Sequence, residues 1–351
     1  MLQKMSNLDY HFVAGELKGI EGARLNKIYE LTPGVLRFKF TKEGNDYHIL
    51  TELGVRMHLT YRLEEAPKAP TSFAMFLRKN LENARLVGVE QLNFDRLVAL
   101  RLQKEKDFLL VFEMFAKGNL LLCDADYKIL QPYRKEEKSG RLLQTGQKFE
   151  LPPKTKLLPA ELSLAEIEKL EGKTADALAS AVSLAPLYIK NALAIAGVEE
   201  NAEISTLPAG QREKILREIQ KTAANAAPTV YYSESGLPVG FCCVELKKPL
   251  GAAKKFETLS KALDEYYSNA SAVQPLTEKQ KATGAPGATA KELEKLERSL
   301  AMQKASLLAV EKEAGELKAK GDAIYANFEK ADELIANARK KNEKKATIEA
   351  A

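Results

Sequence analysis

Two adjacent residues of opposite charge, Asp95 and Arg96, stand where a strand-like run begins at Leu97. The guanidinium of an arginine offers phosphate oxygens a planar fork of donors. An aspartate beside it can orient that fork or accept a hydrogen bond from a base amino group. These residue types therefore fit a nucleic-acid contact. They also fit an ordinary ion pair at a strand end, worth under ~1 kcal/mol, and the residues alone leave both interpretations open.

Three further basic residues precede this pair in the sequence: Arg78, Lys79 and Arg85. The first two lie in FLRKNL, which is predicted to be helical, and the third follows about two turns later. One interpretation is a basic patch near the charged pair, where phosphate contacts would give affinity without sequence choice. A solvated helix face is the alternative interpretation.

Most motifs of cofactor and metal chemistry are absent from the sequence. It contains no GxxxxGKS/T loop, no dinucleotide-binding fingerprint, no HExxH and no CxxC pair. His11, His48 and His58 lack the spacing of metal ligands. Cys242 and Cys243 have apolar neighbours in a predicted strand, so we interpret them as small core residues rather than nucleophiles. The sequence predicts neither a bound metal nor a cofactor.

The composition indicates a folded protein of roughly two domains. Of the 351 residues, 45% are hydrophobic and 29% are charged, which is enough apolar material for a packed core. The formal net charge of +5 permits contact with a polyanion without requiring it. Three cysteines give no disulfide framework, and no apolar run approaches the ~20 residues of a membrane span. We therefore expect a soluble, cytoplasmic protein without membrane contact.

Hydrophobic periodicity divides the chain into parts and indicates an α+β fold. Residues 1–158 contain strand-like runs and two helices, and they predict an antiparallel β domain. The segments TPG at 32–34 and EGN at 43–45 are typical of hairpin turns. Residues 159–272 are mainly helical with one β-hairpin, TVYYSESGLPVGFCCVEL. A polar segment rich in glycine and proline, 273–290, is predicted to be a flexible loop.

The last part, residues 291–351, has apolar residues in alternating steps of three and four. Leu293, Leu296 and Leu300 open this series, which Gln303 and Gly321 interrupt. The spacing is that of coiled-coil core positions, so we predict one long helix whose apolar seam needs a covering partner. Either two chains associate through this seam, or the sequence is a fragment of a longer protein.

Several quoted segments, in this order, resemble one known family. SNLDYHFVAGEL, GARLNKIYEL, SFAMFLRKNLENARL and NFDRLVAL are similar to the N-terminal domain of the NFACT family. SLAPLYIKNALAIAGV resembles the family's helix-hairpin-helix segment, and FETLSKALDEYYS resembles the lead-in to its coiled coil. The resemblance covers nearly the whole chain. It implies a β domain of glycosylase-like architecture, followed by a helix-hairpin-helix region and the first arm of the coiled coil.

The resemblance implies a role in ribosome-associated quality control. Members of the family bind a large ribosomal subunit that is obstructed by peptidyl-tRNA. They recruit charged tRNA, mainly alanyl-tRNA in bacteria and archaea, so that the stalled chain gains a C-terminal tail without mRNA. The ribosome performs the peptidyl transfer, so this chain is expected to be a binding factor with no catalytic residue of its own.

The resemblance also assigns residues. Asp9 matches the family's acidic residue of the first helix, and Asp95 and Arg96 match its Asp-Arg pair, positions implicated in tRNA recruitment. With the basic residues above, the expected tRNA site is Asp9, Asp95, Arg96, Arg78, Lys79 and Arg85. The family's returning coiled-coil arm and C-terminal NFACT-R domain do not follow in this sequence, which leaves ribosome engagement by this chain open.

Two alternative functions compete with this one. The β domain with a helix-hairpin-helix segment also resembles DNA glycosylases in outline, but those use an N-terminal proline followed by glutamate, and this chain begins Met-Leu-Gln. The old name of the family suggests a surface adhesin, but the N-terminus has no apolar signal region. A nucleic-acid-binding enzyme of glycosylase-like architecture stays the second hypothesis.

Overall fold

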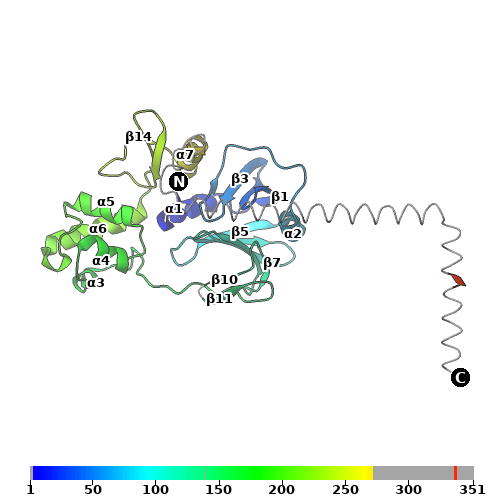
Figure 1. The fold of residues 1–351 in the computed structure, drawn as a ribbon, viewed down its shortest axis with the longest axis horizontal. Coiled ribbons are helices and arrows are strands. Elements are labelled where there is room, and N and C mark those ends of the chain that lie inside the picture. Colours follow the sequence, from blue (N-terminus) through cyan, green and yellow to red (C-terminus); the bar gives the residue numbers. More distant parts are fainter. Residues whose placement is uncertain (1–2, 139, 272–335, 338–351) are drawn as a thin grey trace, which may run out of the picture. The chain divides into compact units, whose positions relative to one another are not determined.

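The computed structural model describes residues 3–138, 140–271 and 336–337 (Figure 1). Met1–Pro275 form one compact unit and Leu276–Ala351 form a second. The predicted loop at 273–290 and nearly all of the predicted coiled-coil arm at 291–351 lie outside the described residues. Both therefore stay predictions.

The first unit is built on an antiparallel sheet of nine strands in the order β4-β3-β2-β1-β5-β6-β7-β8-β9. The strands are β1 (Arg24–Thr32), β2 (Val35–Lys42), β3 (Asn45–Glu52), β4 (Arg56–Leu59), β5 (Arg85–Gln91), β6 (Leu97–Gln103), β7 (Asp107–Glu113), β8 (Asn119–Asp124) and β9 (Ile129–Pro132). The two predicted hairpin turns are confirmed. Gly34, Glu43 and Gly44 have positive φ there, as tight turns between twisted strands require.

Two helices follow the predicted pattern and cover parts of the sheet. Helix α1 (Asn7–Lys18) packs against β4, β5 and β6, and α2 (Ser72–Leu81) packs against β1. In α1, the side chains of Leu8, Val13 and Leu17 are fully buried, because their spacing places them on the face turned toward the sheet. The antiparallel β domain with helices that the sequence predicted is confirmed.

Two turns of this sheet meet at a pair of glycines. A Cβ atom on Gly118 would lie 2.2 Å from the backbone nitrogen of Gly54, and both residues have positive φ. Gly54 follows β3 and Gly118 precedes β8, strands that are far apart in the sheet order. The sheet therefore curls until these turns touch, and only residues without a Cβ allow that approach.

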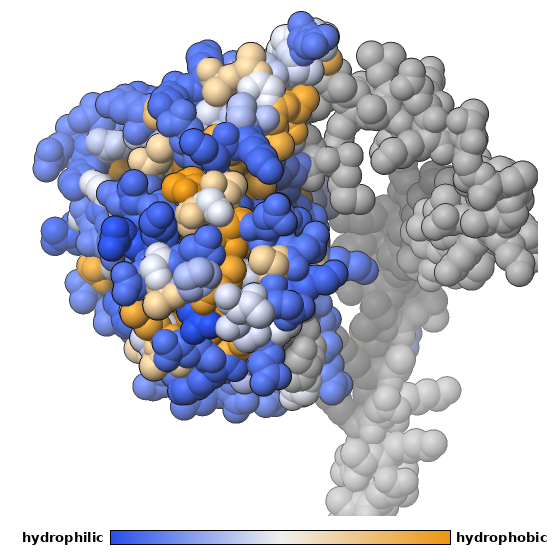
Figure 2. Space-filling model, turned by 90° about the vertical axis from the view of Figure 1, so that its left-hand side faces the viewer, coloured by the Kyte–Doolittle hydropathy of each residue, from blue (hydrophilic) through white to orange (hydrophobic). Residues whose placement is uncertain are grey.

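The chain continues into a helical region on one side of the sheet (Figure 1). It contains α3 (Leu164–Glu168), α4 (Thr174–Ala181), α5 (Pro186–Ala196), the short 3-10 helix η1 (Ile204–Thr206) and α6 (Ala209–Ala224). Three strands, β12 (Thr229–Tyr232), β13 (Pro238–Cys242) and β14 (Ala252–Lys255), form a second sheet, and α7 (Leu259–Ser271) follows. The surface on this side is mainly hydrophilic, with a strip of apolar residues through its middle (Figure 2).

Helix α7 returns to the N-terminal helix and is fixed there by buried polar contacts. The carboxylate of Glu16 in α1 accepts hydrogen bonds from the first two backbone N–H groups of α7, at 2.6 and 3.0 Å. A carboxylate at this position offsets the unpaired N–H groups that every helix start leaves. Asp264 of α7 accepts from the hydroxyl of Thr60 at 2.8 Å. Segments more than 200 residues apart thus share one core.

The sequence missed three short strands: β10 (Glu136–Lys138), β11 (Arg141–Leu143) and β14. Their residues are mostly polar or exposed, so they lack the apolar alternation that identifies a strand. The predicted helices of the second region are confirmed as α3 to α7. The expected boundary between residues 158 and 159 stays a prediction.

Acid should destabilise the packing of α7 through protonation of His58. This side chain is fully buried beside Asp264, and burial lowers the pKa of His58 to about 4 from an ordinary value of 6.5. The folded protein therefore favours the neutral form of His58. The contribution of this residue to the free energy of unfolding is fully present above pH 6.5 and is lost as the pH falls through 4. The loss attributable to this residue is about 3 kcal/mol.

The measurement is urea unfolding between pH 7 and pH 4, with His58→Phe beside the wild type. Phenylalanine keeps an aromatic ring against Tyr267, whose ring lies stacked at 6.3 Å from His58, and it removes the titrating group. We expect a flatter pH dependence in the variant. Parallel curves for the two proteins would contradict this account.

Candidate functional site

The charged pair follows a tight turn between β5 and β6. Asn93 and Phe94 both have positive φ, +52° and +51°, and the N–H of Asp95 donates to the carbonyl of Leu92 at 3.0 Å. Two consecutive left-handed residues define a hairpin turn in which asparagine and glycine are preferred. Phenylalanine at the second position is unfavourable and needs support from the surrounding structure.

Side chains from α1 and β5 supply that support. The amide of Asn7 donates to the carbonyls of Phe94 (3.1 Å) and Ser183 (2.7 Å). The amide of Gln91 donates to the carbonyls of Asn7 (2.7 Å) and Asp95 (2.9 Å). These four bonds tie the turn to the start of α1 and to the loop between α4 and α5. The backbone that presents the charged pair is therefore fixed on both sides.

Asp95 and Arg96 do not form the strand-end ion pair that was the alternative interpretation. The carboxylate of Asp95 accepts a hydrogen bond from the backbone N–H of Arg96 at 2.7 Å. Both side chains are half-buried. Within the described part of the chain, the Arg96 guanidinium has no hydrogen bond or ion pair, so its donors are free to bind a ligand.

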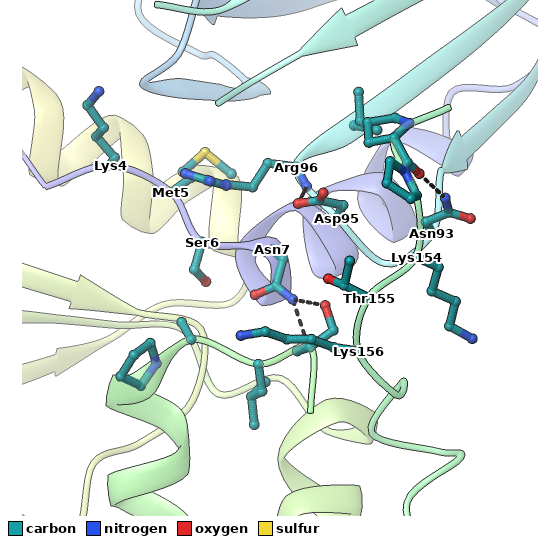
Figure 3. A pocket seen from close by; sticks show the side chains of 17 residues that line it. Lys4, Met5, Ser6, Asn7, Asn93, Asp95, Arg96, Lys154, Thr155 and Lys156 are labelled. Carbon is teal, nitrogen blue, oxygen red and sulfur yellow. Dashed lines mark hydrogen bonds between the residues drawn. The ribbon is translucent and has the colours of Figure 1, made fainter. Parts of the chain in front are cut away.

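A cleft of about 490 Å³ opens in front of this pair (Figure 3). Its walls come from the start of α1, the turn before β6, the linker 152–156 and the loop 183–186. Lys4, Arg96, Lys154 and Lys156 line it, and Asp95 is the only acidic residue among those that do. Arg96 and Lys156 extend toward the same side of the cleft in Figure 3. The Lys156 ammonium donates to the carbonyl of Ala179 at 2.6 Å, and Lys154 pairs with Glu161 at 2.7 Å.

The start of α5 adds to the positive character of the cleft. This helix begins after Ala185, with Pro186 in its first turn, and no side chain caps it. Ala185 and Pro186 both line the cleft. The N-terminal end of a helix carries a partial positive charge. With the cationic side chains, it gives the cleft the chemistry of a phosphate site.

Asp9 lies behind the cleft rather than in it. Its side chain is 1% exposed and closes a capping box at the start of α1, where it accepts from the N–H of Ser6 at 2.6 Å. It also accepts from the hydroxyl of Tyr188 in α5 at 2.8 Å, and that hydroxyl in turn accepts from the N–H of Cys243 at 3.3 Å. Asp9 therefore joins α1, α5 and the residue after β13.

Burial dominates the electrostatics of this network. It raises the pKa of Asp9 above its ordinary range, although the bonds from Ser6 and Tyr188 oppose that shift. It also raises the pKa of Tyr188, which keeps the hydroxyl protonated as a donor. Burial raises the pKa of Cys243 as well, so this thiol is not a nucleophile at neutral pH. The network is structural.

The basic residues predicted to lie near the pair are elsewhere. Strand β5 runs from Arg85 to Gln91, and only its Gln91 end adjoins Asp95. Arg85 is thus about 20 Å away along the strand. Arg78 donates to a backbone carbonyl of β1 at 2.7 Å, and Lys79 follows it on α2. The expectation of one patch around the pair is wrong. Arg85 stands at the opposite end of β5 from the pair, and Arg78 and Lys79 belong to α2, which packs against β1.

The sequence missed other residues of the site. Lys4, Lys154 and Lys156 line the cleft, and Asn7 and Tyr188 hold its walls. The one local signal was the linker ELPPKTKLLP, where prolines flank two lysines. Among the described residues, no group of three or more histidine, cysteine, aspartate or glutamate residues could hold a metal ion. No helix of that part is long and apolar enough to cross a membrane.

Fold and cleft together define a class of protein: a curled antiparallel sheet joined to a helical region, with a cationic cleft at the junction. Residues 6–349 match the family model described as NFACT N-terminal and middle domains. The chain therefore belongs to the NFACT family, as the resemblance had predicted.

Named relatives cover most of this chain. The archaeal Rqc2 homolog aRqcH of Methanocaldococcus jannaschii is 27% identical over 98% of this chain and 53% of its own length. The Rqc2 homolog RqcH of Bacillus subtilis is 26% identical over 71% of this chain and 46% of its own length. The human ribosome quality control complex subunit NEMF is 26% identical over 76% of this chain and 28% of its length. The chain thus spans about half the length of the archaeal and bacterial relatives.

Solved structures share the fold. A structure titled as the fibrinogen binding protein from Staphylococcus aureus has a TM-score of 0.64 and 20% identity, covering 75% of this chain and 98% of the other. The N-terminal part of the fibronectin/fibrinogen-binding protein from Streptococcus suis has a TM-score of 0.61 and 21% identity, covering 76% and 99%. At this identity the likeness concerns the fold alone.

The buried network makes a testable prediction about stability. Asp9→Ala leaves Ser6 and Tyr188 without their acceptor, so we expect the free energy of unfolding to fall by about 3 kcal/mol. Tyr188→Phe removes one donor from a buried carboxyl and should cost about 2 kcal/mol. Urea unfolding at pH 7 measures both changes.

The matched control is Asp126→Ala, which removes an exposed aspartate from the turn between β8 and β9. It should change the free energy of unfolding by less than about 0.5 kcal/mol. If Asp9→Ala were equally mild, Asp9 would not hold the three elements together.

Proposed function

We propose that this chain belongs to a ribosome-associated quality-control factor and that its cleft holds tRNA. The relatives that match it are named as ribosome quality control complex subunits or as Rqc2 homologs, which supports the cellular role. The observation that carries the tRNA proposal is the Arg96 guanidinium in a cationic cleft, where no described residue bonds to it. Guanidinium, ammonium and a helix start are the groups that proteins use for phosphates.

Within the cleft, the residues have different roles. Arg96 donates to a tRNA phosphate, and Lys4 and Lys156 add charge on the two sides. One carboxylate oxygen of Asp95 accepts from the Arg96 N–H. The second oxygen is available to accept from a base amino group. Asp9 acts indirectly, because its burial prevents contact with RNA while its bonds place α5 against α1.

The remaining basic residues form a separate contact in this proposal. Arg78, Lys79 and Arg85 bind RNA phosphates at the far end of β5, independently of the cleft. Contacts of this kind give affinity without selecting a sequence. Selection of alanine tRNA rests on base contacts at the cleft.

The wider role follows from the family. We propose that the factor binds large ribosomal subunits obstructed by peptidyl-tRNA in the cytoplasm and recruits alanyl-tRNA, so that the stalled chain gains a C-terminal tail. The ribosome transfers the peptide, and this chain binds and positions. In this proposal residues 1–158 form the NFACT-N domain, 159–272 the helix-hairpin-helix-containing domain, 273–290 a flexible loop and 291–351 a coiled-coil arm through which chains can associate.

The test is binding of purified protein to total cellular tRNA across a salt series, with Arg96→Ala beside the wild type. We expect affinity to fall about tenfold at low salt and the salt dependence to weaken by roughly one phosphate contact. Sequencing of the recovered RNA should show enrichment of alanine tRNA for the wild type. That enrichment should be lost with Asp95→Ala.

Lys128→Ala is the matched control, because it removes one positive charge from the exposed turn between β8 and β9. It should leave both affinity and tRNA choice unchanged. Equal binding by Arg96→Ala and Lys128→Ala would mean that the cleft is not the tRNA site.

A further inference from the structure

A second recess adjoins the cleft and has a different character. It measures about 410 Å³, and apolar groups dominate its lining: Phe94, Leu158, Pro159, Ala160, Ala223 and Ala224, with His11 and Gln220. The ring of His11 is exposed on α1, and it lies 5.0 Å from the Phe94 ring, tilted by 47°. An open aromatic pair beside an apolar wall is the kind of surface on which unstacked bases rest.

The recess and the cleft share two segments of chain. The turn before β6 places Asn93 and Asp95 in the cleft and Phe94 in the recess. The linker likewise contributes residues 152–156 to the cleft and 158–160 to the recess. A nucleotide has its phosphate and its base one sugar apart. A strand that lies along the turn before β6 can therefore have a phosphate in the cleft and a base in the recess.

The backbone of Phe94 shows that its ring is held in place. A φ of +51° is unfavourable for a bulky residue, and such strain persists only where the surroundings enforce it. The Asn7 amide fixes the carbonyl of Phe94, and its ring packs against the main hydrophobic core. The turn thus keeps an aromatic ring where glycine would be easier to accommodate.

Hydrogen bonds also orient the His11 ring. Because the Gln91 amide nitrogen donates twice, its oxygen is left to accept, and it lies 3.2 Å from Nδ1 of His11. In the neutral ring, Nδ1 therefore carries the proton and Nε2 is an acceptor. Gln91 contacts Asp95 as well, so one side chain sets both the ring and the turn.

We propose that His11 and Phe94 form a binding site for one unstacked nucleobase of a single-stranded RNA loop. The base stacks on the His11 ring against the apolar wall, and Nε2 accepts from an exocyclic amino group. This inference rests on the proposed function, because the RNA strand reaches the recess through the cleft. It adds a base subsite to the phosphate contact of Arg96.

The experiment measures binding of the full chain to a hairpin RNA with an unpaired loop, and to a series in which each loop base in turn is removed to leave an abasic sugar. Stacking of one base on an aromatic residue corresponds to roughly a tenfold change in affinity. His11→Ala should weaken binding about tenfold on the complete loop. One abasic RNA should bind the wild type about tenfold more weakly, and His11→Ala should then have no further effect on it.

Two variants separate stacking from folding. Phe94→Leu keeps an apolar side chain in the core but removes the ring, and it should give the same pattern as His11→Ala. Tyr61→Ala removes an aromatic side chain that is 60% exposed after β4, and it should bind every RNA like the wild type. Circular dichroism confirms that the variants are folded.

The outcomes are distinct for the two proposals. If His11→Ala binds the complete loop like the wild type, or loses the same factor on every abasic RNA, the base subsite is wrong. If Arg96→Ala weakens binding to all the RNAs in that case, the proposed function still stands. If the wild type binds none of the RNAs, both proposals fail.

Discussion

One buried carboxylate, that of Asp9, determines how the parts of this unit meet. It accepts from the start of its own helix and from Tyr188, which belongs to another helix and itself accepts from the N–H of Cys243. A carboxyl that is taken out of water needs such partners, because desolvation is costly. Tyr188 belongs to α5 and also bonds to the residue after β13, so this network joins α1, α5 and that segment. Residues at the starts of α1 and α5 line the cleft, so this network holds those walls in place.

Burial gives different roles to Asp9 and Arg96, which the family resemblance assigns to the same tRNA site. Asp9 has used its oxygens inside the protein, whereas Arg96 has every guanidinium donor unused in the described part of the chain. A buried, fully bonded group such as Asp9 fixes the positions of the elements around a site, whereas a group with free donors such as Arg96 can bind a ligand directly. If the cleft holds tRNA as proposed, loss of either residue would weaken binding, although of the two only Arg96 lines the cleft.

Sequence patterns predicted the helices and strands but not the contacts between elements that are distant in the sequence. Apolar alternation gave the strands, and the segments TPG and EGN gave the first two hairpins. The Asp95–Arg96 pair was assigned to a binding site by the family resemblance, because its residue types alone fit an ordinary ion pair equally well. Arg85 was misplaced because proximity in sequence says nothing about the end of a strand at which a residue stands. The bond between Asp9 and Tyr188 spans 179 positions, and no local pattern encodes it.

Hydrogen exchange of the wild-type chain with and without purified tRNA tests the central claim most directly. If the preformed cleft is where tRNA binds, amides of 93–96, 154–156 and 183–189 should gain the strongest protection. Amides of the turn between β8 and β9, whose residues do not line the cleft, should exchange as in the free protein. Protection confined to 78–85, with none around 93–96 and 183–189, would contradict the account.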